Sequence, residues 1–192
     1  MDFKEEISFS THSKIAMLAY ARESIVTHLS EDVNHTEPEF EHMGDELGVF
    51  VTLRKGINLK GCVGKIFADC SLKDSLKDMA ISSATRDPRF FPVDLKEMNS
   101  ISIEISVLSP FSEVKNIEEI QIGKHGLMIE HDGKRGVFLP EVALDQGWEI
   151  LSFIEQLCYK AELAITVFKD DPRLLKFETI KFSDDIKQRS KK

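Results

Sequence analysis

The 192-residue sequence has few cysteines, and their number is odd. The three are Cys62, Cys70 and Cys158, and none belongs to a Cys-x-x-Cys pair. Small secreted proteins held together by disulfides carry an even and larger set. We therefore expect no disulfide framework, and the cysteine usage favours a reducing, cytoplasmic location.

Long apolar runs are also missing. No uninterrupted apolar stretch approaches the roughly 18 residues that a membrane-spanning helix needs. The first ten residues, MDFKEEISFS, contain acidic side chains and no apolar core of a secretory signal. Association with a membrane and secretion are therefore both unexpected.

The third deficit is positive charge, because 25 Lys and Arg face 33 Asp and Glu, for a net charge of −8. Nucleic-acid binding over a whole surface needs a basic surface, so a general nucleic-acid coat is excluded. The charge is uneven, however. Residues 31–46 hold seven acids and no Lys or Arg, whereas residues 54–65 hold four basic residues and no acid. The sequence therefore leaves room for a small anionic ligand near the second segment.

What remains is a globular composition, with 42% apolar and 30% charged residues. The length predicts one domain over residues 1–192, with its core at about 10–182. Within that domain, residues 31–46 are interpreted as an acidic connector and residues 187–192 as a frayed basic tail.

The periodicity of apolar residues predicts a mixed order of elements. Helices are expected over residues 13–30, from Ser71 onward, and over 140–160 with a break at Gly147. Strands are expected over 47–54, 62–67, 100–108 and 174–182, and a hairpin over 126–140 turns at Asp132-Gly133. The many hairpins, without regular strand–helix alternation, predict an α+β fold with helices flanking a mostly antiparallel sheet.

The segment Lys60-Gly61-Cys62-Val63-Gly64 is the first candidate for chemistry. Glycines beside a cysteine allow a ligand to approach the backbone closely. Nearby cations such as Arg54 and Lys60 would favour the thiolate, which is the nucleophilic form. The competing interpretation is that Cys62 is a small buried apolar residue of a strand.

Two further residues are candidates for acid–base chemistry. His125, set between Gly123 and Gly126, is a candidate general base, and the alternative is a solvated histidine in a turn. Glu104 lies on the polar side of the expected strand 100–108. If that strand shares a sheet with Thr52 and Arg54, the three would form a polar floor. The alternative is an ordinary strand that faces solvent.

The Asp87-Pro88-Arg89-Phe90 segment is a proline-stiffened loop. Arg89 there is a candidate clamp for a carboxylate or a phosphate group. The alternative is an ion pair between Asp87 and Arg89 that fixes the loop. No dinucleotide-binding, phosphate-loop, serine-hydrolase or zinc-protease motif is present, so no cofactor is indicated and no metal site is predicted.

Several ordered motifs together resemble the AMMECR family, also called AmmeMemoRadiSam system protein A. They are GVFVTL (48–53), LKGCVG (59–64), SA (83–84), DPRF (87–90) with Pro92, EISVL (104–108), GKHGL (123–127), LPEVA (139–143) and QGW (146–148). The resemblance implies a larger and a smaller lobe, with a cleft near the glycine–cysteine motif. It also implies a pathway shared with radical-SAM and Memo-like proteins. The sequence departs from the family at Lys60, where the family usually has Arg, and at residues 161–164, where it often has Ala-Gly-Leu-Pro.

These observations together predict an intracellular enzyme or enzyme subunit acting on a polar, nucleotide or RNA-derived substrate. The predicted catalytic residues are Cys62, His125 and Glu104. The predicted substrate-binding residues are Arg54, Lys60, Gly61, Gly64, Asp87 and Arg89. The alternative functions are a non-catalytic adaptor that recognises a partner protein and, third, an RNA-binding protein.

Overall fold

The computed structural model describes residues 7–30 and 37–184, and it falls into two compact units. The first comprises Met1–Leu108 and Ile180–Lys192, and the second comprises Ser109–Thr179. The expected basic tail lies outside the described residues, as do residues 31–36 of the expected acidic connector. The unequal sizes of the units agree with the larger and smaller lobes implied by the resemblance.

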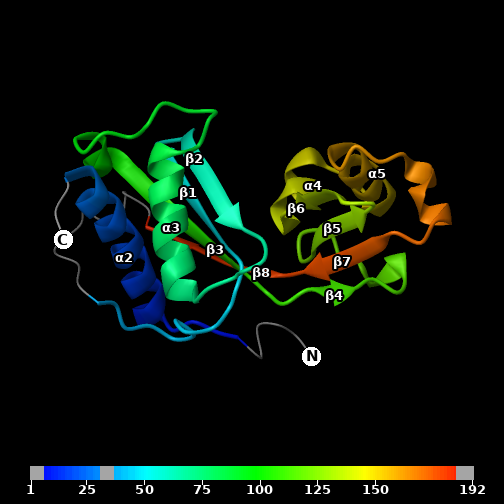
Figure 1. Ribbon diagram of the computed structural model, residues 1–192, viewed down its shortest axis with the longest axis horizontal. Helices are drawn as coiled ribbons and strands as arrows, with labels where there is room; N and C mark the ends of the chain where they lie inside the picture. Colours follow the sequence, from blue (N-terminus) through cyan, green and yellow to red (C-terminus); the bar gives the residue numbers. More distant parts are fainter. Residues whose placement is uncertain (1–6, 31–36, 185–192) are drawn as a thin grey trace. The chain divides into compact units, whose positions relative to one another are not determined.

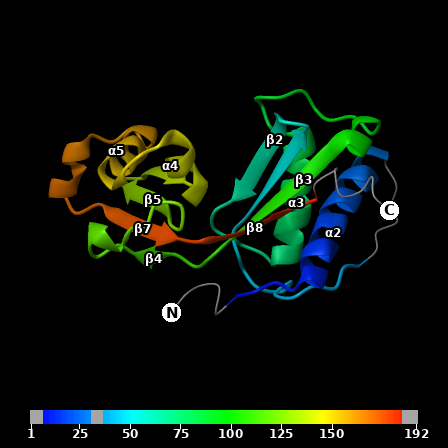
Figure 2. The same ribbon diagram turned by 180° about the vertical axis from the view of Figure 1, so that it is seen from behind.

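The first unit is a four-stranded sheet with helices on one face (Figure 1). The strand order is β2-β1-β3-β8, and β1 pairs antiparallel with both β2 and β3. Seen from behind, the strands lie in front of the helices, so the opposite face carries no helix among the residues that the structure describes in this unit (Figure 2). The elements are α2 (Thr11–Ser30), β1 (Val49–Lys55), β2 (Asn58–Lys65), α3 (Leu72–Thr85), the 3-10 turn Glu97–Ser100, β3 (Ile101–Leu108) and β8 (Thr179–Ser183).

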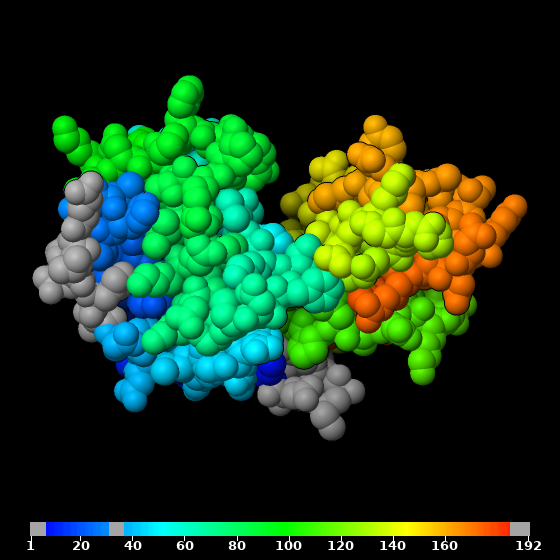
Figure 3. Space-filling view, in the orientation of Figure 1, coloured from blue at the N-terminus to red at the C-terminus, as the bar shows by residue number. Residues whose placement is uncertain are grey.

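Strict alternation in β1 and β3 explains why one face of the sheet is covered. Val49, Val51 and Leu53 of β1 are fully buried, as are Ile103 and Ile105 of β3. They pack in one core with the apolar residues of α2 and α3. The atoms of α3 cover the middle of this unit in the space-filling view (Figure 3). The residues between them along each strand point to the other face, because successive side chains alternate.

Apolar residues at helical spacing predict that one stripe of the first helix, interrupted by Arg22, is buried: Ile15, Leu18, Ala19, Ile25, Val26 and Leu29. This prediction is partly wrong. Ile15 is 62% exposed, whereas the small polar residues Ser13 and Ser24 are buried. The reason is that α2 packs against both α3 and β3, and small side chains allow this close approach. Arg22, which interrupts the stripe, donates hydrogen bonds to the Ile101 carbonyl at 2.7 Å and to Asp184 at 2.8 Å.

The second unit is also a sheet with flanking helices, and its strand order is β4-β7-β5-β6. The predicted hairpin is confirmed, and the two-residue loop places His131 opposite Lys134 across the turn. Asp132 and Gly133 both have positive φ, as a type I′ turn requires. The elements are β4 (Ser112–Glu113), the 3-10 turn Ile117–Glu119, β5 (Gly126–His131), β6 (Lys134–Phe138), α4 (Pro140–Gln146), α5 (Ile150–Lys160), the 3-10 turn Ile165–Lys169 and β7 (Arg173–Phe177).

The single strand expected over residues 174–182 is wrong. The chain leaves β7 at Phe177 and enters β8 at Thr179, and the two strands belong to different sheets. At Glu178, between them, the backbone exchanges hydrogen bonds with Ser109: the Ser109 amide donates to the Glu178 carbonyl, and the Glu178 amide donates to the Ser109 hydroxyl. The α+β class with antiparallel pairing is confirmed.

Candidate functional site

A row of four side chains crosses the helix-free face of the first sheet, one from each strand. Cys62 and Glu104 both lie in register with Thr52, from either side. The Thr52 hydroxyl donates a hydrogen bond to Cys62 Sγ at 3.2 Å. At the other end, Lys181 of β8 forms an ion pair with Glu104 at 2.9 Å. We call Cys62, Thr52, Glu104 and Lys181 the polar row.

The predicted polar floor requires that the strand of Glu104 shares a sheet with Thr52 and Arg54, and it does. Thr52 and Glu104 are neighbours in one sheet, and Arg54 pairs with Ser102 two residues farther along. The strands therefore bring the predicted polar residues to one face. Lys181 was missed by sequence reasoning, because its strand was expected to run on unbroken from residue 174.

The main chain of Cys62 is held by an ion pair. Its amide donates to Asp87 Oδ2 at 2.8 Å, and its carbonyl accepts from Arg89 Nη2 at 3.1 Å. Asp87 and Arg89 bind each other at 2.7 Å. Because β2 is an edge strand, these contacts satisfy peptide groups that no further strand can reach. Asp87 and Arg89 therefore position Cys62.

Asp87 and Arg89 shift each other's pKa values. The Arg89 guanidinium, which donates two hydrogen bonds to the carboxylate, holds the pKa of Asp87 far below its ordinary value, and the Cys62 amide adds to the effect. Asp87 raises the pKa of Arg89 in return, and the negative charge of a Cys62 thiolate contributes in the same direction. The Asp87 side chain is 3% exposed and that of Arg89 is 58% exposed. The ion-pair alternative for this loop is thus present, and Arg89 still reaches solvent.

The two glycines of the motif have close neighbours within the protein. A Cβ on Gly61 would lie 1.9 Å from the carbonyl oxygen of Ser83 in α3, and one on Gly64 would lie 2.3 Å from the Phe50 ring. Gly61 therefore lets β2 pack against α3. The Ser83 hydroxyl adds to this contact, since it accepts from the Val63 amide and donates to a carbonyl of β1. Substrate binding by the two glycines stays a prediction.

The predicted cations of the site differ in their surroundings. Lys60 lies 3.5 Å from Glu97, which also binds Lys55 at 3.0 Å. These cations lower the pKa of Glu97, mainly through the hydrogen bond from Lys55. The Arg54 guanidinium has neither a hydrogen bond nor an ion pair with any residue that the structure describes. Arg54 is therefore the better candidate for an anionic ligand.

His125 belongs to the second unit, whereas Cys62 and Glu104 belong to the first. It is 8% exposed, and its Nδ1 accepts a hydrogen bond from the Gln121 amide at 3.0 Å. Burial lowers the pKa of His125, and so does the charge of Lys176, against a smaller opposing effect of Glu178. In the neutral ring the other nitrogen then carries the proton. This arrangement fixes the loop before β5, and the role of general base stays a prediction.

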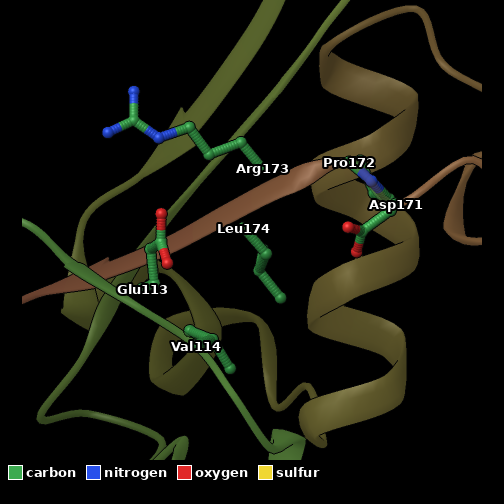
Figure 4. A pocket seen from close by; sticks show the side chains of 6 residues that line it. All are labelled: Glu113, Val114, Asp171, Pro172, Arg173 and Leu174. Carbon is green, nitrogen blue, oxygen red and sulfur yellow. The ribbon is translucent and has the colours of Figure 1, made fainter.

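A pocket of about 270 Å³ lies in the second unit. It is lined by Glu113 and Val114 at β4 and by residues 171–174 leading into β7 (Figure 4). None of the residues predicted as catalytic or substrate-binding lines it. No sequence signal pointed to it, because its residues follow no recognised motif.

The sequence pattern of the AMMECR1 family matches residues 18–182. The chain belongs to the AMMECR1 family. This AMMECR1-family chain is 39% identical over 163 residues to Protein Mbar_A1807 of Methanosarcina barkeri, covering 77% of this chain and 78% of that one. It is 38% identical over 152 residues to Protein MJ0810 of Methanocaldococcus jannaschii, covering 75% and 76%. The crystal structure of Uncharacterized Protein PH0010 from Pyrococcus horikoshii matches it with a TM-score of 0.78 and 29% identity, covering 90% and 91%.

Within residues 7–30 and 37–184, no helix is long and apolar enough to span a membrane. In the same part of the chain, no three His, Cys, Asp or Glu side chains are grouped as metal ligands would be.

Proposed function

We propose that this AMMECR1-family protein is an enzyme, or a subunit of one, in which the Cys62 thiol meets a polar, anionic substrate on the helix-free face of the first sheet. The observation that carries the proposal is the hydrogen bond from Thr52 to Cys62 Sγ, on a residue whose main chain is held at both peptide groups. A donor aimed at sulfur stabilises the thiolate, which is the reactive form.

The contrast with Cys158 supports this proposal. Cys158 is buried in the core of the second unit, and burial raises the pKa of its thiol. Cys62 is only half-buried and lies beside a hydroxyl donor. A free thiol with these properties persists in a reducing compartment, so the proposal includes a cytoplasmic site of action.

The chemistry proposed is nucleophilic attack by sulfur. The thiol proton passes to the Glu104 carboxylate through a hydroxyl group of the ligand or a water molecule, because Thr52 and two strand spacings separate the two residues. The sulfur electron pair forms a bond to an electrophilic carbon, and the leaving group departs with the electrons of its own bond. Glu104 then returns the proton to the leaving group. In a second step water attacks the carbon bound to sulfur, the C–S bond breaks, and the sulfur takes up the proton that water releases, which restores the thiol. Glu104 lies one strand beyond Thr52, so its carboxylate and the thiol flank a ligand that covers Thr52. Nucleotides and RNA-derived molecules are the proposed substrates, in a pathway with radical-SAM and Memo-like proteins.

Substrate consumption tests the proposal. The purified wild-type protein and a Cys62→Ser variant are incubated with a polar metabolite extract, and mass spectrometry follows each component. We expect the wild-type protein to convert at least one anionic component that Cys62→Ser leaves unchanged. Matching melting curves confirm that both proteins are folded. Identical conversion by the two proteins, or none by either, contradicts the proposal.

One observation favours the alternative of a non-catalytic adaptor. Phe91 is 90% exposed on a loop anchored at both ends, by the Asp87–Arg89 pair and by the bond from the Val93 amide to the Ala84 carbonyl. Exposed aromatic residues on rigid supports are typical anchors of protein interfaces. The adaptor function predicts a stable complex with a Memo-like or radical-SAM protein in size-exclusion chromatography. That complex would be lost in Phe91→Ser and retained in Cys62→Ser.

A further inference from the structure

The Phe50 ring lies beside the polar row, two residues before Thr52 on the same strand face. It pairs across the sheet with Gly64 on β2 and with Ser106 on β3. Three ring carbons, Cγ, Cδ1 and Cδ2, lie within 2.3, 2.3 and 2.8 Å of the position that a Cβ on Gly64 would occupy. The ring therefore lies flat on the backbone of Gly64. Phe50 is only half-buried, so part of this flat ring stays accessible.

The Arg54 guanidinium lies on the same face, beyond the polar row. A strand rises about 3.4 Å per residue, so the Cα atoms of Phe50 and Arg54 are roughly 14 Å apart. Arg54 has no carboxylate partner among the described residues, whereas Glu97 neutralises the nearby Lys55 and Lys60. Along β1 the order is therefore an aromatic ring, the polar row and an unneutralised cation.

We infer that Phe50 is a stacking surface and Arg54 an anion site, so that the ligand carries a planar aromatic ring joined to a phosphate or other anionic group. The middle of such a ligand crosses the polar row, where Glu104 accepts hydrogen bonds from hydroxyl groups. A nucleoside diphosphate has this construction, with a ring, a hydroxylated sugar and a terminal anion. Aromatic side chains stack on any base, because every base has a π-face. The location of the ligand rests on the proposed function, but its ring and anion subsites do not depend on reactivity of the thiol.

Three probes separate the two subsites in isothermal titration calorimetry of the full-length chain. ADP carries both groups, adenosine carries the ring alone, and pyrophosphate carries the anion alone. We expect ADP to bind more tightly than either part. Phe50→Leu should weaken ADP and adenosine by at least about fivefold and leave pyrophosphate unchanged. Arg54→Gln should weaken ADP and pyrophosphate and leave adenosine unchanged.

Two matched variants distinguish a loss of the ring from a loss of folding. Phe50→Tyr keeps the ring and should bind ADP like the wild type, and Phe91→Leu removes an exposed ring elsewhere in the same unit and should have no effect. The inference is overturned if ADP gives no heat at millimolar concentration, or if Phe50→Leu weakens pyrophosphate as much as adenosine. If ADP binds with the expected pattern while Cys62→Ser converts the metabolite extract like the wild type, the subsites stand and the proposed catalysis fails. If ADP does not bind with this pattern while Cys62→Ser loses the conversion, the subsites are refuted and the proposed catalysis stands.

Discussion

Asp87 should be the most sensitive position of the candidate site, and Asp87→Asn is the variant that reveals it. The carboxylate accepts four hydrogen bonds: one from the Cys62 amide and three from the amide, Nε and Nη2 of Arg89. An asparagine keeps one acceptor oxygen and turns a donor NH₂ toward these donors. Hydrogen bonds to a charged group are worth about 1.5–3 kcal/mol each.

The expected loss of stability is about 3 kcal/mol. Two bonds of this strength are lost, but the remaining Arg89 is more than half exposed and regains water. Urea unfolding measures the loss, and amide hydrogen exchange at Cys62 should become faster because its acceptor is weakened. Asp145→Asn, at an exposed acid in α4, is the control and should change stability by less than about 0.5 kcal/mol. A loss of stability below about 1 kcal/mol for Asp87→Asn, with amide exchange at Cys62 unchanged, would refute the claim that Asp87 holds the main chain of Cys62.

The same pair predicts a dependence on pH. Because the pKa of folded Asp87 lies far below that of the unfolded chain, its contribution is complete above about pH 4–5 and is lost as the pH falls toward the folded value. The difference in unfolding free energy between wild type and Asp87→Asn should therefore shrink as the pH drops below about 3.8. A difference that stays constant down to pH 2 contradicts this assignment.

Three further predictions concern packing, a buried ion pair and a histidine. Gly61→Ala should cost about 1–3 kcal/mol in urea unfolding, since its Cβ would meet a backbone oxygen, whereas Gly44→Ala, with open space around it, should be near neutral. Arg22→Met should cost roughly 2–4 kcal/mol, because it removes the ion pair with the partly buried Asp184 and the hydrogen bond to the Ile101 carbonyl, and a loss under about 1 kcal/mol argues against that role. Since the pKa of His125 is lowered in the folded state, the unfolded chain binds more protons, and stability should fall as the pH drops below about 6.5. His125→Gln should flatten this slope between pH 5 and 7, and an unchanged slope would show that another group causes it.

Local patterns made much of the fold predictable. The Asp132-Gly133 turn fixed a hairpin whose register follows from a two-residue loop, and the alternation of β1 and β3 showed their buried faces. Ser71 caps the start of α3 as expected, because its hydroxyl accepts a hydrogen bond from the Asp74 amide. Each of these features depends on residues a few positions apart.

Features that depend on distant contacts were not predictable in the same way. The face of α2 was misjudged because the helix packs on two neighbours, which buries Ser24 and leaves Ile15 exposed. The break at Glu178 carries no glycine or proline, and it becomes visible only through its pairing with Ser109.

In the candidate site too, local patterns were predictable and distant contacts were not. Alternation placed Thr52 and Glu104 on polar faces, but their register with Cys62 needed the pairing of three strands. The contact between Asp87 and the Cys62 amide spans 25 residues of sequence, so the loop could be recognised as stiff while its function stayed open. His125 has a motif like that of Cys62, yet its nearest partners are in its own unit.

The rate of Cys62 alkylation tests the central claim most directly. Native protein is treated with iodoacetamide at neutral pH, and peptide mass spectrometry follows each cysteine in the wild type and in Thr52→Val, with the buried Cys158 as the internal reference. The account predicts that Cys62 reacts well before Cys158 and that Thr52→Val slows it by about fivefold, the equivalent of one hydrogen bond. A Cys62 that reacts no faster than Cys158, or at the same rate in Thr52→Val as in the wild type, would contradict it.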